Sequence, residues 1–208
     1  RLASQDGFYA NLTYTWGISK DVNSGVSAQA RSSWRFNPQQ GDPNLPVLTF
    51  SVNDRRHRIL AALSYTLDWG MQGLKTNFGV FYNGFSGRPF SYFVNGDING
   101  DGEVDNDLIY IPRDANDIIL VNSAGTELAK DDAAYQTLFN YINNDDYLSE
   151  NKGSMSERNG AREPWTHQID LRISQQIGTF TGHNFEITFD VLNVLNLINE
   201  EWGWVKQV

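Results

Sequence analysis

Oxygen-bearing side chains alternate with other residues in one short stretch near the middle of the chain, and their spacing is that of a cation-binding loop. The stretch is "GDINGDGEVDNDL", and its candidate metal ligands are Asp97, Asn99, Asp101, Glu103, Asp105 and Asp107. Calcium loops of the EF-hand type take ligands at positions 1, 3, 5, 7, 9 and 12, with glycine at position 6. Counted from Asp97, the head of the loop fits this pattern, but position 12 is Leu108 and the nearest carboxylate stands one residue early.

Two interpretations of this loop are open. In the first, calcium bridges carboxylates that would otherwise repel one another, and it braces an exposed loop with the millimolar affinity of extracellular modules. In the second, the Asp and Asn side chains form Asx turns that cap their own backbone and face solvent. The flanking segments "RPFSYFV" and "LIYIPRD" are rich in β-formers, so the helices of an EF-hand are not expected. Both interpretations give the loop a structural role without catalysis.

β-Strands are the elements expected to hold this loop, because apolar residues recur at every second position along much of the chain. The pattern predicts six long strands, over residues 7–19, 26–36, 57–69, 76–84, 167–177 and 184–194. Globular strands are usually about 5–6 residues long, whereas those of transmembrane barrels alternate over about 10 residues. Short turns are expected at "KDVNSG" and "GTFTGH", and long polar loops over 37–55 and 84–164. Such alternation of turns and loops indicates an all-β fold, an antiparallel transmembrane β-barrel segment.

The two faces of the predicted strands differ in polarity. The polar positions are expected to line a wet lumen: Asn11, Thr13, Thr15, Gln29, Arg31, Arg35, Asp170, Arg172, Glu186 and Asp190. Aromatic residues near the strand ends are expected to form interfacial girdles: Tyr14, Trp16, Tyr65, Trp69 and Trp165. A soluble sheet with one face on a core gives the same alternation, so a soluble β-sandwich is the alternative.

One segment of the long loop departs from the β pattern. In "DDAAYQTLFNYINNDDYLSE", Ala134, Leu138, Phe139 and Ile142 recur at helical spacing, behind Asp131 or Asp132 as a cap. The spacing predicts a short helix within the long loop rather than a separate domain.

Composition and motifs argue against several classes of function. The chain has 208 residues with a net charge of −9, which lacks the basic footprint of a nucleic-acid-binding protein. Cysteine is absent, so disulfides and thiolate metal sites are excluded. The three histidines lack a second ligand at metal-site spacing. Nucleophile-elbow and phosphate-binding glycine motifs are also missing. We therefore expect that the protein is not an enzyme.

Two groups of arginines have more than one interpretation. The cluster "RRHR", residues 55–58, is expected to form a positive patch near lipid headgroups, with a site for lipopolysaccharide phosphates or another anion as the alternative. Arg158 and Arg162, in "GSMSERNGAREP", are interpreted as lumen charges or as part of a solvated loop.

Several phrases of the sequence occur in an order known from one family. They are "YTWGISKDVNSG", "NDRRHRILAALSYTLDWG", "FYNGFSGRPFSYF", "GDINGDGEVDNDLIYIPRD", "RNGAREPWTHQIDLRISQQI" and "FEITFDVLNVLNLIN". Together they span nearly the whole chain, which resembles the C-terminal third of the barrel in TonB-dependent outer-membrane receptors. The likeness is to the subgroup with a carboxypeptidase-regulatory-like domain ahead of the plug domain.

The resemblance implies a barrel of about 22 strands with a plugged lumen, in the outer membrane of a Gram-negative bacterium. Residues 1–208 would be a partial barrel domain, with 84–164 as a long extracellular loop region around the Asp-rich loop 97–107. The implied partners are outer-membrane lipid, the protein's own plug domain, the TonB energy-coupling complex and an unknown small ligand. Because the sequence has no plug domain or TonB box and stops before a terminal strand, we expect a fragment of such a barrel.

The sequence therefore supports two main hypotheses about function. The first is import of a scarce nutrient, such as a ferric siderophore, an oligosaccharide or a peptide, by a TonB-dependent receptor. The alternative is an outer-membrane surface β-protein that uses a calcium-braced loop in adhesion or assembly. A soluble β-sandwich that binds calcium is a third hypothesis.

Overall fold

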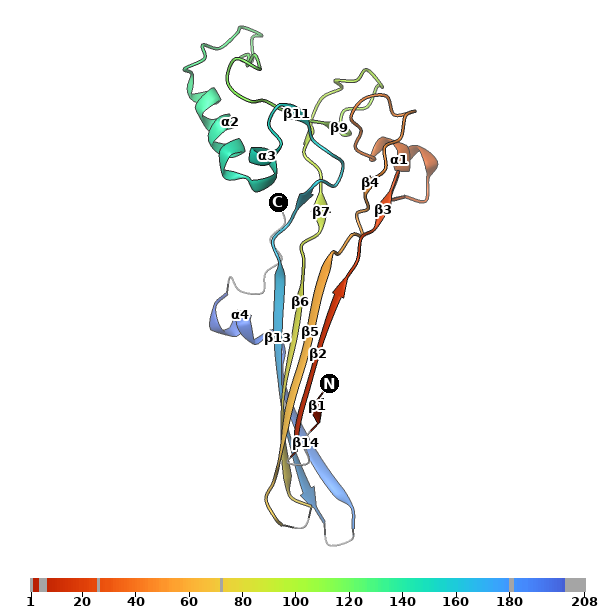
Figure 1. Ribbon diagram of the computed structural model, residues 1–208, viewed down its shortest axis with the longest axis vertical. Helices are drawn as coiled ribbons and strands as arrows, with labels where there is room; N and C mark the ends of the chain where they lie inside the picture. The colour runs from red at the N-terminus through yellow and green to blue at the C-terminus, as the bar shows by residue number, and fades with distance from the viewer. Residues whose placement is uncertain (1, 4–6, 26, 72, 180–181, 201–208) are drawn as a thin grey trace. The chain divides into compact units, whose positions relative to one another are not determined.

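The chain folds into two units, each with its own set of elements (Figure 1). The computed structural model describes residues 2–3, 7–25, 27–71, 73–179 and 182–200. The first unit, here called the sheet unit, takes in the chain up to Ile18, Arg55–Gly87 and the chain from Glu163 onward. The second, here called the loop unit, consists of Ser19–Asp54 and Arg88–Arg162.

The sheet unit is one antiparallel sheet with the strand order β1-β2-β5-β6-β13-β14 (Figure 1). Its strands are β1 (Leu2–Ala3), β2 (Phe8–Trp16), β5 (His57–Asp68), β6 (Lys75–Phe85), β13 (Thr166–Gly178) and β14 (Asn184–Val191). β5, β6 and β13 contain 12, 11 and 13 residues, well beyond the usual length of a globular strand. The long strands predicted from alternation are therefore confirmed in five of the six places.

The register of the sheet brings the apolar positions of the five long strands onto one face. Ala10, Leu63, Val80, Leu171 and Val191 form one cross-strand row, each directly opposite the next. Because directly opposite residues point to the same side of a sheet, the whole row lies on a single face. A one-residue slip would move every member to the other face, so the hydrophobic pattern strongly specifies this register.

The neighbouring row lies on the opposite face and is polar. It runs from Tyr9 through Ser64, Gly79 and Arg172 to Asp190, again with each residue opposite the next. These two rows therefore place an apolar and a polar face on opposite sides of the five long strands.

The strand predicted over residues 26–36 is wrong. Its first residue, Val26, lies outside the described residues, and its second half forms helix α1 (Ala30–Arg35) in the loop unit. The alternation there rests mainly on alanines and serines, and alanine and arginine are good helix formers. β2 instead pairs with β5, from Phe8 opposite Tyr65 to Trp16 opposite His57.

Two further predictions fail with that strand. "KDVNSG" does not form a turn between sheet strands, because β3 (Lys20–Asp21) pairs with β4 (Thr49–Phe50) in the loop unit. Gln29, Arg31 and Arg35 also lie in the loop unit and cannot line a lumen as members of a sheet strand.

The C-terminal strand ends earlier than predicted. β14 stops at Val191, and helix α4 (Val194–Ile198) follows. Asn193 adopts a left-handed backbone with φ of 53°, and its backbone N–H donates a 2.8 Å hydrogen bond to Asp170 Oδ1. The left-handed conformation of Asn193 ends the extended strand, and the bond to β13 holds the chain at this point.

Besides α1 and the β3–β4 pair, the loop unit contains three further pairs of short strands and two further helices. The pairs are β7 (Pro89–Phe90) with β12 (Ala161–Arg162), β8 (Phe93–Val94) with β9 (Asp107–Leu108), and β10 (Tyr110–Ile111) with β11 (Ser154–Met155). The helices are α2 (Ala133–Asn144) and α3 (Asp146–Glu150). Ile111, Ile142 and Leu148 form a buried cluster against which Leu138 and Phe139 pack.

The predicted helix is confirmed with its cap, but it is divided in two. Asp132 caps α2 by accepting a 2.8 Å hydrogen bond from the Ala134 backbone N–H. Asp145 adopts an extended backbone, ends α2, and caps α3 through the Leu148 N–H at 2.8 Å. Ala134 is exposed, and the neighbouring Tyr135 is buried in its place.

Candidate functional site

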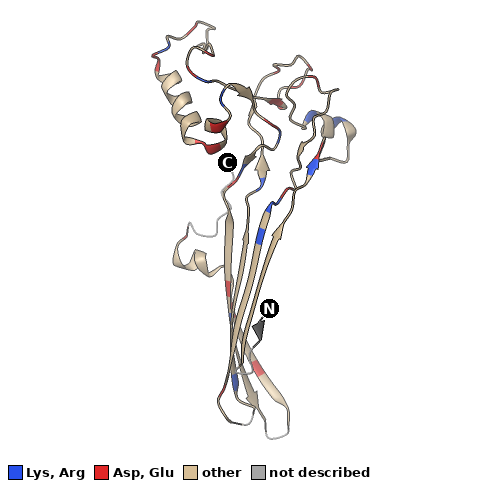
Figure 2. Cartoon of the chain, in the orientation of Figure 1, with Lys and Arg blue, Asp and Glu red and all other residues tan. Residues whose placement is uncertain are grey.

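The apolar face of the sheet unit is exposed. The exposed fraction is 72% for Leu12 and 65% for Phe189. Other large exposed side chains on the same face are Tyr14, Trp16, Leu63, Tyr65, Phe78, Val80, Ile173, Ile177, Phe185 and Ile187. Figure 2 shows few charged residues along these strands. An apolar surface of this extent marks an interaction with lipid or with another protein.

Aromatic rings and histidines form a continuous row near one end of this face. Tyr14 hydroxyl and His57 Nδ1 lie 2.7 Å apart, as do Tyr82 hydroxyl and His167 Nδ1. Trp165 stacks between the two histidines, with ring centroids 5.9 Å from His57 and 6.0 Å from His167. The predicted Tyr14 and Trp165 are joined by two histidines and Tyr82, which the sequence alone did not assign to a girdle.

A second aromatic group lies toward the other end of the same strands. Tyr65 stands opposite Phe78, and Trp69 Nε1 donates a 2.8 Å hydrogen bond to Thr76 Oγ1. His57 and Trp69 are twelve residues apart, which is roughly 40 Å along a strand. A strand tilted by about 40° would bring this span close to 30 Å across the bilayer. The two aromatic groups therefore have the spacing of interfacial girdles.

The polar face carries paired groups that lipid would not tolerate. Arg172 binds Asp190 through two bonds, Nε to Oδ1 at 2.6 Å and Nη2 to Oδ2 at 2.9 Å. Asn77 Nδ2 donates to Thr66 Oγ1 at 2.8 Å. Charged side chains on a lipid-facing surface are destabilising, whereas a barrel interior accepts them. This alternation of faces is the pattern of an outer-membrane barrel.

A family model described as "Outer membrane beta barrel domain" matches residues 2–200 of the chain. The chain belongs to the outer membrane beta barrel domain family. It is therefore a protein of the Gram-negative outer membrane. Searches of curated proteins and of solved structures found no match.

Within the described residues of this outer-membrane β-barrel protein, the sheet is open and no closed barrel is formed. No helix among those residues is both long and apolar enough to span a membrane.

The Asp-rich loop of the barrel protein is folded as a series of Asx turns. Asp97 Oδ1 accepts hydrogen bonds from the backbone N–H groups of Gly100 at 2.6 Å and Asp101 at 3.1 Å, and its Oδ2 accepts one from Gly102 at 3.0 Å. Gly100 and Gly102 have φ of 77° and 86°, so the loop requires glycine at both positions.

Two of the six predicted ligands are engaged by arginines of the same unit. Arg35 Nε lies 2.8 Å from Glu103 Oε2, and its Nη2 lies 3.5 Å from Asp105 Oδ2. Arg31 adds a longer contact of 4.0 Å to Glu103. These cations reduce the carboxylate repulsion on which the calcium interpretation partly rested.

The other predicted ligands are satisfied within the loop. Asn99 Oδ1 accepts from the Asp101 backbone N–H at 2.9 Å, and Asp107 Oδ2 accepts from the Ile98 N–H at 2.6 Å. Burial acts to raise the pKa of Asp101, but hydrogen bonds from the Glu103 amide and from asparagine side chains outweigh it and lower the pKa below 3.8. Among the described residues, no three His, Asp or Glu side chains are grouped so that they could hold a metal ion. Calcium binding stays a prediction.

Two arginines that the sequence left as lumen or solvated charges form ion pairs in the loop unit: Arg158 is buried, and Arg162 is partly buried. Arg162 pairs with the fully buried Asp54, and its Nη1 donates to the Asp54 carbonyl at 2.8 Å. Asp54 Oδ1 also accepts the Ser19 backbone N–H at 2.7 Å. This network joins the two chain segments of the unit through residues that are far apart in sequence.

Arg158 makes the second of these pairs. Its Nη1 lies 2.9 Å from Asp21 Oδ1, and its Nη2 donates to the Asp21 carbonyl at 2.5 Å. Burial acts to raise the pKa of Asp21, but hydrogen bonds from Ser51 and Ser24 and the Arg158 charge together hold it below its ordinary value of 3.8.

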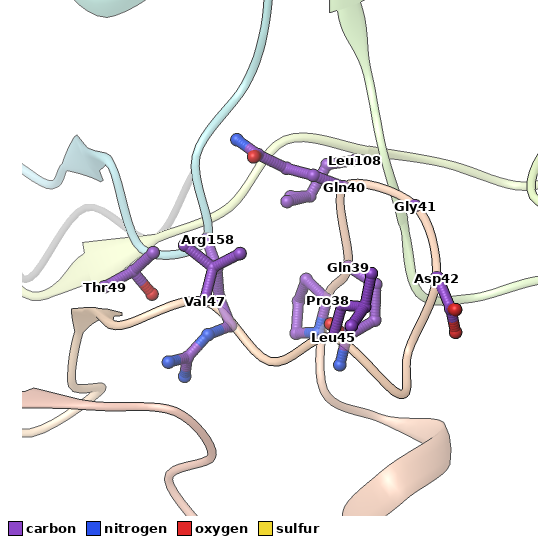
Figure 3. A pocket seen from close by; sticks show the side chains of 10 residues that line it. All are labelled: Pro38, Gln39, Gln40, Gly41, Asp42, Leu45, Val47, Thr49, Leu108 and Arg158. Atoms are coloured by element: carbon purple, nitrogen blue, oxygen red, sulfur yellow. The ribbon is translucent and has the colours of Figure 1, made fainter.

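Two adjoining hollows lie in the loop unit and share Gly41 and Asp42 as lining residues. The smaller has a volume of about 190 Å³ and combines apolar with polar walls (Figure 3). Its apolar lining residues are Pro38, Leu45, Val47 and Leu108, and its polar ones include Gln39, Gln40 and Thr49. Thr49 is buried, and its hydroxyl has no hydrogen-bond partner among the described residues.

The larger hollow has a volume of about 530 Å³ and is more polar. Its lining includes Trp34, Asp42, Asn44, Asn99 and Asp101. Ligand sites are usually clefts of about 300–1,000 Å³, so this hollow has the size of a small-molecule site. Trp34 was predicted to be a strand residue, and only the tertiary structure places it beside the Asp-rich loop.

Proposed function

We propose that this chain forms the C-terminal part of the barrel of a TonB-dependent outer-membrane receptor that imports a scarce nutrient. The observation that carries the proposal is the loop unit. The segments between β2 and β5 and between β6 and β13 do not run as simple loops but build a unit with a buried cluster and a hollow of ligand size.

The chain order agrees with a receptor whose ligand-binding elements face the exterior. All four connections between the two units fall at the same end of the antiparallel strands: after β2, before β5, after β6 and before β13. The turns after β5 and β13 fall at the other end and are short. In outer-membrane barrels the long loops are extracellular and the short turns periplasmic.

The polar face of the sheet supports a filled lumen. The Arg172–Asp190 pair and the neighbouring asparagines and threonines on this face suit contact with a plug domain. An open sheet of this size would need further strands to close, and we propose a complete barrel of about 22 strands. The ordered phrases quoted above resemble the same receptors.

The alternative is a surface protein that uses the loop unit in adhesion or assembly. The acidic loop 97–107 favours it, because its exposed Asp97 would offer a carboxylate to a partner at the cell surface. Calcium, in this proposal as in the receptor, would brace the loop through Asp97, Asn99 and Asp101 without taking part in chemistry.

Energised uptake separates the two functions. Cells that carry the protein would be tested for accumulation of a labelled ligand, with and without a protonophore that collapses the inner-membrane proton gradient. A receptor gives uptake that the protonophore and loss of the coupling complex both abolish, while surface binding persists. Accumulation that is indifferent to both treatments would refute the receptor proposal. Cell attachment without any energised uptake would also refute it and would support adhesion.

A further inference from the structure

The two hollows of the loop unit have a polar lining that can both donate and accept hydrogen bonds. Asp42 Oδ1 accepts from the Asn44 backbone N–H at 2.8 Å and from Asn44 Nδ2 at 2.9 Å. This arrangement leaves Asp42 Oδ2 and Asn44 Oδ1 without a partner among the described residues. The side-chain amide of Gln39 is likewise unengaged in the described part of the chain and lines the smaller hollow.

The charge of the lining restricts the ligand. Arg158 is the one cation among the lining residues of both hollows, and it is already bound to Asp21. Asp42 and Asp101 bring negative charge to the larger hollow. An anionic ligand would therefore meet carboxylates with no available cation to offset them.

An aromatic wall completes the larger hollow. Trp34 lines it together with the Asp and Asn side chains, and its indole N–H makes no hydrogen bond within the described residues. A tryptophan offers a wide apolar face with a polar N–H at its edge. The alternating C–H and O–H groups of a sugar ring match such a face combined with carboxylate and amide groups, because hydroxyls both donate and accept.

We propose that the two hollows form a subsite for a neutral oligosaccharide, with Trp34 as the stacking residue and Asp42, Asn44 and Gln39 as the hydroxyl-binding residues. This inference rests on the proposed receptor function and names its substrate class. A peptide fits less well, because its terminal carboxylate would need a cation that the lining does not offer. A ferric siderophore that carries negative charge is disfavoured for the same reason.

The test is equilibrium binding to the detergent-purified protein. The probes are neutral gluco-, manno-, xylo- and galacto-oligosaccharides, a ferric catecholate, a ferric hydroxamate and a pool of short peptides. We expect saturable binding of a neutral oligosaccharide that Trp34→Ala weakens about tenfold, while Trp34→Phe retains most of it. Asp42→Asn and Asn44→Ala should each weaken the same ligand, and Asn116→Ala, an exposed asparagine of the same unit, should not.

Each other outcome overturns the inference. Binding only of a siderophore or a peptide, binding of none of the probes, or glycan binding that the Trp34 and Asn44 variants leave unchanged would each refute it. The two proposals fail separately. Energised uptake of a siderophore would support the receptor proposal and refute the glycan subsite. Glycan binding without energised uptake would support the glycan subsite and refute the receptor proposal.

Discussion

Replacing Arg162 with methionine tests whether the buried Arg162–Asp54 pair holds the loop unit together. Asp54 is fully buried, and the variant would remove the guanidinium from its carboxylate, which also accepts the Ser19 N–H. Loss of one partner from a buried ion pair costs about 3–5 kcal/mol. Because the Arg162 side chain is 22% exposed, we discount this to about 2–4 kcal/mol.

Hydrogen exchange of the detergent-solubilised protein measures this effect by segment. A cost of about 2–4 kcal/mol corresponds to roughly 30- to 700-fold faster exchange through local opening, since 1.4 kcal/mol is a factor of ten. The increase should appear in Ser19–Asp54 and Arg88–Arg162 and leave the sheet unit unchanged. Arg31→Met is the matched control, because the Arg31 side chain is 84% exposed and its contact with the Glu103 carboxylate is long, at 4.0 Å. Equal exchange in the two variants would refute the reasoning.

Three further predictions concern the membrane face, pH and calcium. Leu12→Arg should cost about 2–4 kcal/mol of folding free energy in bilayers, whereas Thr13→Arg on the polar face should cost much less; equal losses in refolding titrations would contradict the assignment of faces. The pKa of Asp21 is lowered in the folded state, so its contribution to stability is complete above about pH 3.8 and is lost as pH falls through the folded value. Asp21→Asn should therefore flatten the acid limb of a pH-unfolding curve, and an unchanged limb would show that Asp21 is not its source. If the calcium prediction holds, isothermal titration with calcium should give a millimolar affinity that Asp97→Asn abolishes. If millimolar calcium gives no binding heat, the calcium prediction is wrong and the Asx turns alone stabilise the loop.

The strands that alternation predicted best are those whose pattern is long. Residues 57–69 and 167–177 matched β5 and β13 closely, because a period of two sustained over more than ten residues does not fit the 3.6-residue period of a helix. Residues 26–36 alternated as well, but with alanine and serine at many positions, and such residues gain little from a sheet face. The cap of α2 was predictable for a different reason, since an Asp ahead of a helical run acts locally.

The candidate site was only partly predictable. The six oxygen-bearing residues of loop 97–107 were identified from their spacing, but that spacing contained no sign that Arg35 would pair with Glu103. Nor could it place Trp34 beside Asn99 and Asp101 in one hollow. A search for tryptophan near Asp- and Asn-rich segments would have named the right residue types without bringing them together.

By itself the sequence determined the two faces of the sheet, the helix with its cap, and the turn-rich character of the acidic loop, because each depends on residues within a few positions of one another. The tertiary structure alone decided that β2 pairs with β5, that Arg162 reaches Asp54 across 108 residues, and that the segments 19–54 and 88–162 build one unit. These are contacts between distant segments. Periodicity states which face a residue prefers, but the choice of partner depends on how all the strands and loops pack at once.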